Sequence, residues 1–121
     1  MTMNPRVTIR EKLERIESEK MPIEYKLHHM LELAMALTGE GYVSDDYTKF
    51  IEFEMGGITI FSDPYYQRVQ IDEQDLNQGQ LRKLTKELKK RILAFDQKTH
   101  GARKKAAKET LQKPLENFTL E

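Results

Sequence analysis

Histidines and carboxylates are the side chains that most often do acid–base chemistry or bind metals, and one group of them has regular spacing. Glu24, His28 and Glu32 recur every four residues in a helix-forming segment, so they share one flank of that helix. Such a column suits a weak metal site or a base oriented by a carboxylate. The plainer interpretation is a solvated flank with helix-stabilising pairs, and that is what we expect here.

A second pair of carboxylates, Glu52 and Glu54, points to one side of a predicted strand, about 7 Å apart. Paired carboxylates at such a distance can act on glycosidic bonds, but that chemistry needs a cleft and a raised pKa. Two glutamates on a wet sheet face are the ordinary explanation. The chain has no cysteine, and it lacks a zinc spacing, a phosphate-binding glycine loop and a recognisable serine–histidine–acid signature. We therefore expect no catalytic, cofactor-binding or metal-ligating residues, and an enzyme has no positive support.

Basic residues dominate the C-terminal third of the chain. Residues 78 to 113 hold 12 Lys and Arg against 3 Asp and Glu. Several of these cations fall opposite a leucine stripe and form one positive helix face. This face could contact nucleic-acid phosphates, an acidic protein surface, or solvent alone. The predicted contact residues are Arg82, Lys86, Lys89, Lys90, Lys98, Arg103, Lys104, Lys105 and Lys108.

An aromatic group comes before the basic segment. Tyr65 and Tyr66 are adjacent, and Tyr42 and Tyr47 are nearby in sequence. They could form a platform that stacks nucleic-acid bases, or a protein-binding patch. Tyrosines at a strand edge more often cover a small core and are partly buried, which is the plainer expectation.

The net charge of zero hides an asymmetry between the two parts of the chain. Residues 1–77 carry 8 basic and 15 acidic residues, a balance of −7, and residues 78–121 carry 12 and 5, a balance of +7. Such asymmetry suggests a partner for the basic part, or a match of opposite charges within one molecule or between copies. No apolar run approaches the ~18 residues that span a membrane. We expect a cytoplasmic protein that does not contact membranes.

The fold is organised around residues 49–61, which read as a β-hairpin. Alternating apolar residues lead into Gly56 and Gly57, which suit the two central positions of a type I′ turn. That turn pairs Met55 with Ile58, and it puts five apolar side chains on one face that helices must cover.

Two helices are predicted before the hairpin, over about residues 8–20 and 22–38. After it we expect a strand over 67–71 and a polar connection over 72–77. A long helix then runs to about residue 100, with an apolar stripe of Leu81, Leu84, Leu88, Ile92 and Phe95. The prediction is an α+β domain over 7–100, with an antiparallel meander of three strands, or four if 41–43 pairs, and the long helix packed on one sheet face. Residues 1–6 are expected to be disordered and 101–121 to form a basic tail, helical or disordered, with too few apolar residues to bury a face.

With 121 residues, 38% apolar and 33% charged, the chain suits a single small domain. We expect a non-enzymatic protein-interaction or regulatory module whose contact surface is the basic C-terminal helix and tail. Its partner would be a protein with an acidic surface, or a second copy of the chain. The alternative is a nucleic-acid-binding accessory protein that contacts phosphates through the same helix with little sequence specificity.

Overall fold

The computed structural model describes residues 8–99 and 104–114, and their side chains over 8–95 and 108–114. Its elements are α1 (Ile9–Ser18), α2 (Ile23–Thr38), β1 (Tyr42–Val43), β2 (Ile51–Met55), β3 (Ile58–Asp63), β4 (Arg68–Ile71), β5 (Gln74–Asp75), α3 (Gln78–Thr99) and α4 (Lys104–Leu111). The five strands form one antiparallel sheet in the order in which they occur along the chain. The α+β prediction is confirmed.

The central hairpin of β2 and β3 has the predicted register. Met55 pairs with Ile58, and Phe53 with Ile60. Gly56 and Gly57 have φ angles of 58° and 91°, as a type I′ turn requires at both central positions. Side chains on β2 alternate between buried and exposed, so one face of the sheet belongs to the core and the other to solvent.

The sheet has five strands, whereas we predicted three, or four if 41–43 paired. β1 pairs with β2 as the fourth strand that we left open, whereas β5 falls in the segment predicted to be a polar connection, so that prediction was wrong. A two-residue turn joins β4 to β5, and both of its residues, Asp72 and Glu73, have positive φ angles of 49° and 71°. Turns of this kind usually contain glycine or asparagine, so the sequence carried no hairpin signal here.

The helix ends follow local chemistry that the sequence shows. Thr8 and Glu11 form a capping box at the start of α1. Gly39 ends α2 in the left-handed conformation at φ 72°. At the start of α3, the Asn77 side chain accepts a hydrogen bond from the Gln80 amide and the Gln80 side chain accepts one from the Asn77 amide, each at 2.9 Å.

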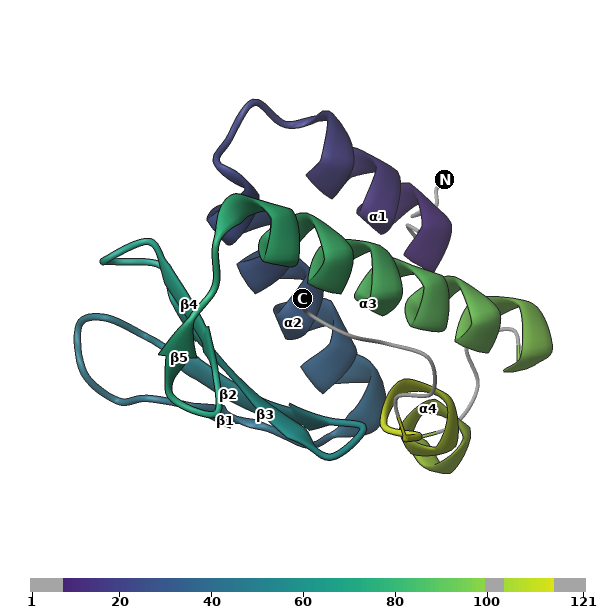
Figure 1. Ribbon diagram of the computed structural model, residues 1–121. Coiled ribbons are helices and arrows are strands. Elements are labelled where there is room, and N and C mark those ends of the chain that lie inside the picture. Colours follow the sequence, from purple (N-terminus) through teal and green to yellow (C-terminus); the bar gives the residue numbers. More distant parts are fainter. Residues whose placement is uncertain (1–7, 100–103, 115–121) are drawn as a thin grey trace.

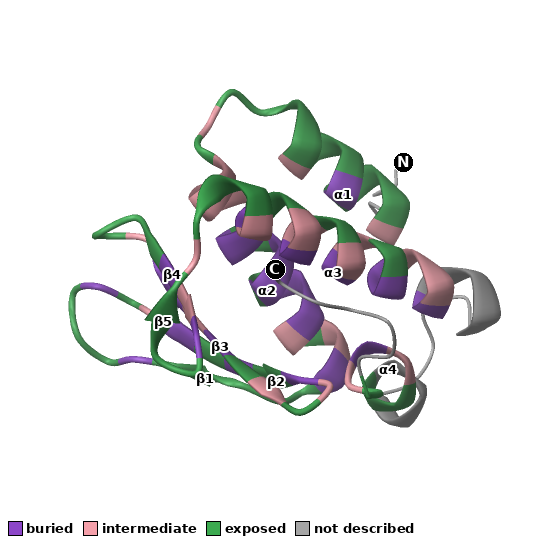
Figure 2. Ribbon diagram, viewed as in Figure 1, coloured by how far each residue is buried: buried purple, intermediate pink, exposed green. Residues whose placement is uncertain are grey.

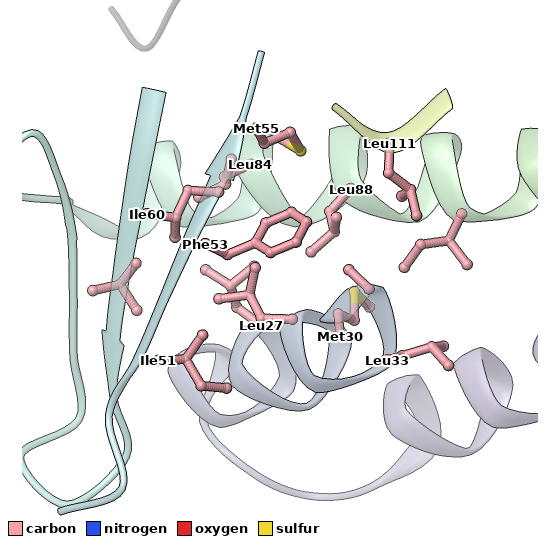
Figure 3. Close-up of a cluster of buried hydrophobic side chains, with 14 of the residues drawn as sticks. Leu27, Met30, Leu33, Ile51, Phe53, Met55, Ile60, Leu84, Leu88 and Leu111 are labelled. Carbon is pink, nitrogen blue, oxygen red and sulfur yellow. The ribbon is translucent and has the colours of Figure 1, made fainter. Parts of the chain in front are cut away.

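The layers differ in one respect from the prediction. α2 is the helix that lies against β2 and β3, while α3 lies against α2, α1 and α4 (Figure 1). The stripe of α3 still reaches the common core, where Leu84 and Leu88 point towards Phe53 of the sheet and Leu27 of α2 (Figure 3). The sheet therefore has α2 as its nearest helix, and the apolar stripe of α3 completes the core beside α2.

The C-terminal segment corrects a second expectation. α4 packs against α2 and α3 at the end of the domain, and Leu111 is fully buried in the core. Three polar side chains hold the segment as well. Arg91 donates to the carbonyl groups of Leu111, Lys113 and Pro114; Lys108 pairs with Glu40 at 2.7 Å; and the Gln112 side chain donates to the Glu54 carbonyl at 2.9 Å. Over residues 104–111 the chain is thus a docked helix, although we predicted too few apolar residues to bury a face.

Candidate functional site

The basic face of α3 is the first candidate surface. Arg82, Lys86 and Lys90 are exposed and make no ion pair or hydrogen bond through their side chains within the described residues. They span about 12 Å along the helix, since each residue adds about 1.5 Å. The opposite side of α3 is buried (Figure 2). The sequence predicted this separation, and the structure places the three cations on one rigid helix.

Two of the predicted contact residues are already engaged. The Lys89 ammonium lies 2.9 Å from both carboxylate oxygens of Glu17 in α1, and Lys108 pairs with Glu40. Lys98, Lys104 and Lys105 lie on described helices but their side chains are outside the described part, and Arg103 is outside it entirely. Among the described side chains, the exposed cations of α3 without an ion pair therefore lie between residues 82 and 90.

A groove of about 510 Å³ runs beside this face, between α3 and the segments that lead from α1 into α2. Its polar lining is mostly cationic, because Glu17 contributes the single carboxylate. The residues that line it are Glu17, Ile23, Gly79, Arg82, Lys83, Thr85, Lys86 and Lys89. A groove with this lining attracts anionic groups.

The tyrosines form the second candidate surface, which we call the tyrosine cluster: Tyr47, Tyr65 and Tyr66. The rings of Tyr47 and Tyr66 each meet the ring of Tyr65 edge to face, at centroid distances of 4.9 Å. The three side chains are 69%, 60% and 60% exposed. The expectation that Tyr65 and Tyr66 are partly buried covers was therefore wrong, because these rings pack against one another outside the core.

Two aspartates hold the loops that carry the tyrosine cluster. Asp46 accepts hydrogen bonds from the hydroxyl groups of Ser44 and Thr48 and from the Thr48 amide. The hydroxyl groups of Thr48 and Ser44 lower the pKa of this carboxyl group. In the second loop, Asp63 accepts hydrogen bonds from the amides of Tyr65 and Tyr66 at 2.9 and 3.2 Å. Each loop is thus closed by its own carboxylate.

The phenol groups join the two loops. The hydroxyl oxygens of Tyr47 and Tyr66 lie 3.3 Å apart, and this hydrogen bond raises the pKa of Tyr47 above its ordinary value of about 10. The Tyr47 phenol is therefore neutral at pH 7. Lys49, at the end of the first loop, has a left-handed backbone with φ 55°, and its side chain is exposed.

A shallow depression of about 430 Å³ lies between the tyrosine cluster and the first turns of α2. It is lined by Tyr25, His28, His29, Tyr47, Thr48, Lys49, Pro64 and Tyr65. Sequence analysis missed Tyr25 and Lys49, because only the fold brings α2 beside the two loops. The one sign of this depression in the local sequence was Asp63, before Pro64, because an aspartate there indicates a turn in which its carboxylate accepts hydrogen bonds from the backbone.

His28 corrects the expectation of a solvated helix flank. It is only 5% exposed, and its Nδ1 atom lies 2.8 Å from the Ser62 hydroxyl oxygen. Burial lowers the pKa of the imidazole, so it is neutral at pH 7. The neighbouring His29 is exposed and pairs with Glu32 at 2.9 Å. The pair of His28 and Ser62 does not resemble a catalytic dyad, because Ser62 is 1% exposed and a substrate cannot reach it.

The remaining sequence candidates give no further site. Glu52 and Glu54 are exposed on the solvent side of β2 and line neither the groove nor the depression. Within the described residues, no three His, Asp or Glu side chains are grouped so that they could hold a metal ion. The described helices include none that is long and apolar enough to cross a membrane. Comparison of the chain with models of known protein families, with curated proteins and with solved structures gave no match.

Proposed function

We propose that this chain is a small protein-interaction module that binds an acidic surface of its partner through the basic face of α3. The observation that carries the proposal is the set of three exposed cations, Arg82, Lys86 and Lys90, which lack an acidic partner within the described residues. α3 is also packed against three other helices, so these side chains project from a rigid support. Charge complementarity of this kind speeds association and selects partners more than it adds affinity.

The groove beside the helix supports the same proposal. Lys86 borders both this groove and the exposed face, so an acidic segment of a partner could contact the groove and the face together. The Lys89–Glu17 pair at the groove is more than a third exposed on both sides and is worth little in stability, so a stronger acidic ligand can exchange with Glu17.

Charge reversal on the basic face of α3, made in the full-length protein, tests for this partner. Arg82→Glu, Lys86→Glu and Lys90→Glu are combined in one variant, and Arg10→Glu, Lys12→Glu and Lys20→Glu on or just after α1 form a control of equal charge change. Both variants and the wild type are used to capture proteins from a native lysate with and without nuclease. We expect a protein that the wild type and the control retain after nuclease treatment and the α3 variant loses. Capture that does not change on α3 reversal contradicts the proposal.

A second copy of the chain is one form that the acidic partner can take. The solvent side of β2 carries Glu52 and Glu54, and α3 lies with α2 on the buried side of the sheet (Figure 1). Contact between the acidic sheet face of one copy and the basic helix of the next predicts a mass above 14.3 kDa in light scattering, which falls as salt is added. A monomer at every salt concentration excludes this form.

Nucleic acid is the second candidate, and the exposed tyrosine cluster favours it. Ile23 borders the cationic groove and Tyr25 borders the tyrosine depression, so both surfaces adjoin the first turn of α2. Proteins that bind single strands combine a cationic track with aromatic rings on which bases stack. Neutralisation of three phosphates gives a slope of about −2 in a plot of log affinity against log salt. No gel shift of single-stranded DNA at low salt would exclude this candidate.

A further inference from the structure

The depression beside the tyrosine cluster has the properties of a built site. Its loops are closed by Asp46, which accepts hydrogen bonds from two hydroxyl groups and one amide of its loop, and by Asp63, which accepts hydrogen bonds from two amides of its loop. The loops are joined through the ring contact of Tyr47 with Tyr65. A ligand that enters therefore has few groups left to order, which reduces the entropy cost of binding. The volume of about 430 Å³ lies in the range of pockets that take small molecules.

The lining determines the chemistry of the ligand. Aromatic rings come from both sides, with Tyr25 on α2 and Tyr47 and Tyr65 on the loops. Lys49 is the one ammonium group in the lining, and none of the described lining residues carries a carboxylate. Asp46 and Asp63 keep their negative charges, but they are not among the lining residues, and their carboxylates accept hydrogen bonds from their own loops. A planar ring that bears an anionic group fits such a lining.

His28 is the buried polar residue among those that line this depression. Its exposed fraction is only 5%. Nδ1 is engaged by Ser62, while no described residue bonds to Nε2. A neutral imidazole nitrogen can donate or accept a hydrogen bond, depending on its tautomer. The edge of a nucleobase offers both kinds of partner.

We infer that the depression binds a nucleotide, with its base packed against the tyrosine rings and its phosphate on Lys49. The nucleotide can be free or can belong to a single strand, since both present the same base and phosphate. This inference goes beyond the proposed protein-interaction function, because it uses no residue of the basic face of α3, and it shares the tyrosine cluster with the nucleic-acid candidate. The protein-interaction proposal and this inference can therefore fail separately.

The test uses two kinds of probe, the four ribonucleoside monophosphates and a ten-residue oligothymidylate, and measures their binding by titration calorimetry. NMR locates the site through the amide chemical shifts of Thr48, Lys49 and Tyr65. Tyr65→Leu removes the ring and keeps an apolar side chain. Since stacking of a base on an aromatic ring contributes about 1–3 kcal/mol, we expect binding to weaken about 5- to 150-fold. Lys49→Gln should weaken binding of both probes, and it should make the salt slope of oligothymidylate binding about 0.7 less steep.

The controls separate this site from other surfaces and from loss of the fold. Tyr42→Leu changes a tyrosine that is 52% exposed but lies outside the depression, and it should bind as the wild type does. The triple Glu variant of α3 should bind mononucleotides normally. Binding of mononucleotides identifies a free nucleotide as the ligand, and binding of the oligonucleotide alone identifies a single strand. No binding of either probe overturns the inference, as does binding that Tyr65→Leu and Lys49→Gln leave unchanged.

Discussion

The guanidinium group of Arg91 closes the C-terminal end of α4, because its Nη1 atom lies 3.1 Å from the carbonyl oxygen of Leu111. The same group donates to the carbonyl oxygens of Lys113 and Pro114 at 2.6 and 3.2 Å, and its Nε atom lies 2.8 Å from Glu87. The last carbonyl groups of a helix lack partners within the helix, and a cation is favourable beside them. One buried side chain of α3 thus satisfies the end of α4 and fixes it to the domain.

Substitution of Arg91 should release α4 from the domain. Arg91→Met keeps an unbranched apolar stem and removes the donors, each of which contributes about 1.5–3 kcal/mol as a charged partner. We expect the Gln112 amide, which is bonded to the Lys108 carbonyl at the end of α4, to exchange with solvent about 100-fold faster. Hydrogen exchange followed by NMR measures this. Lys90→Met, at an exposed neighbouring position, is the control, and equal exchange in both variants would show that Arg91 does not hold α4.

Leu111 is the apolar counterpart of this contact. Its side chain is fully buried in the core, so Leu111→Ala should lower the free energy of unfolding by about 2–5 kcal/mol. Glu109→Ala, on the exposed side of the same helix, should change it by no more than about 0.5 kcal/mol. Urea unfolding of the whole chain gives both values. A small effect of Leu111→Ala would restore the earlier view that α4 is not part of the core.

The comparison of Leu111 with the hairpin shows which parts of the fold the sequence could predict. The register of β2 and β3 depends on neighbours along the chain, namely alternating residues and a glycine pair, so a local pattern was sufficient. A single leucine in α4 has no periodic partners, and its burial depends on a gap between α2 and α3 that only the tertiary structure creates. β5 was missed for a related reason, since the Asp72–Glu73 turn lacks the usual glycine.

The candidate surfaces show the same division. The positive face of α3 could be predicted because helical periodicity separates Lys86 from the leucine stripe. The burial of His28 could not, because its partner Ser62 lies on β3, 34 residues away along the chain. The charge pattern likewise did not show that Lys108 is paired with Glu40. Long-range pairing therefore decides which charged residues stay available, and sequence spacing alone does not contain it.

The turn between β2 and β3 allows the energetic cost of a positive φ angle to be measured by itself, because a side chain at Gly57 would not clash with any neighbour. A Cβ atom at Gly57 would meet no heavy atom within 4 Å, but φ is +91° there. Gly57→Ala should therefore cost about 1–2 kcal/mol through backbone strain alone. Gly56→Asn creates the Asn-Gly pair that type I′ turns prefer, and it should change the stability by less than about 0.5 kcal/mol. Urea unfolding compares them, and equal stabilities of the two variants would argue against this turn.

His28 should make the stability of the fold depend on pH in the range between about 5.5 and 7.5. Burial lowers its pKa in the folded state, while the unfolded chain keeps a value of about 6.5. Below pH 6.5 the unfolded state therefore binds more protons than the folded state, and the free energy of unfolding falls as the pH falls. The slope cannot exceed about 1.4 kcal/mol per pH unit for one group. The negative charges of Glu32 and Asp63 oppose the effect of burial, and His29 adds to it.

Substitution isolates this contribution from that of the other titrating groups. His28→Gln can still form a hydrogen bond with Ser62 but does not titrate, so its urea midpoint should change less between pH 7.5 and 5.5 than that of the wild type. His29→Gln changes the exposed neighbour and should retain the wild-type slope of His28. If His28 stays neutral in the folded state and gains a proton in the unfolded state, lowering the pH must reduce the free energy of unfolding of the wild type more than that of His28→Gln. Parallel pH curves for the two proteins would therefore mean that the buried imidazole does not resist protonation.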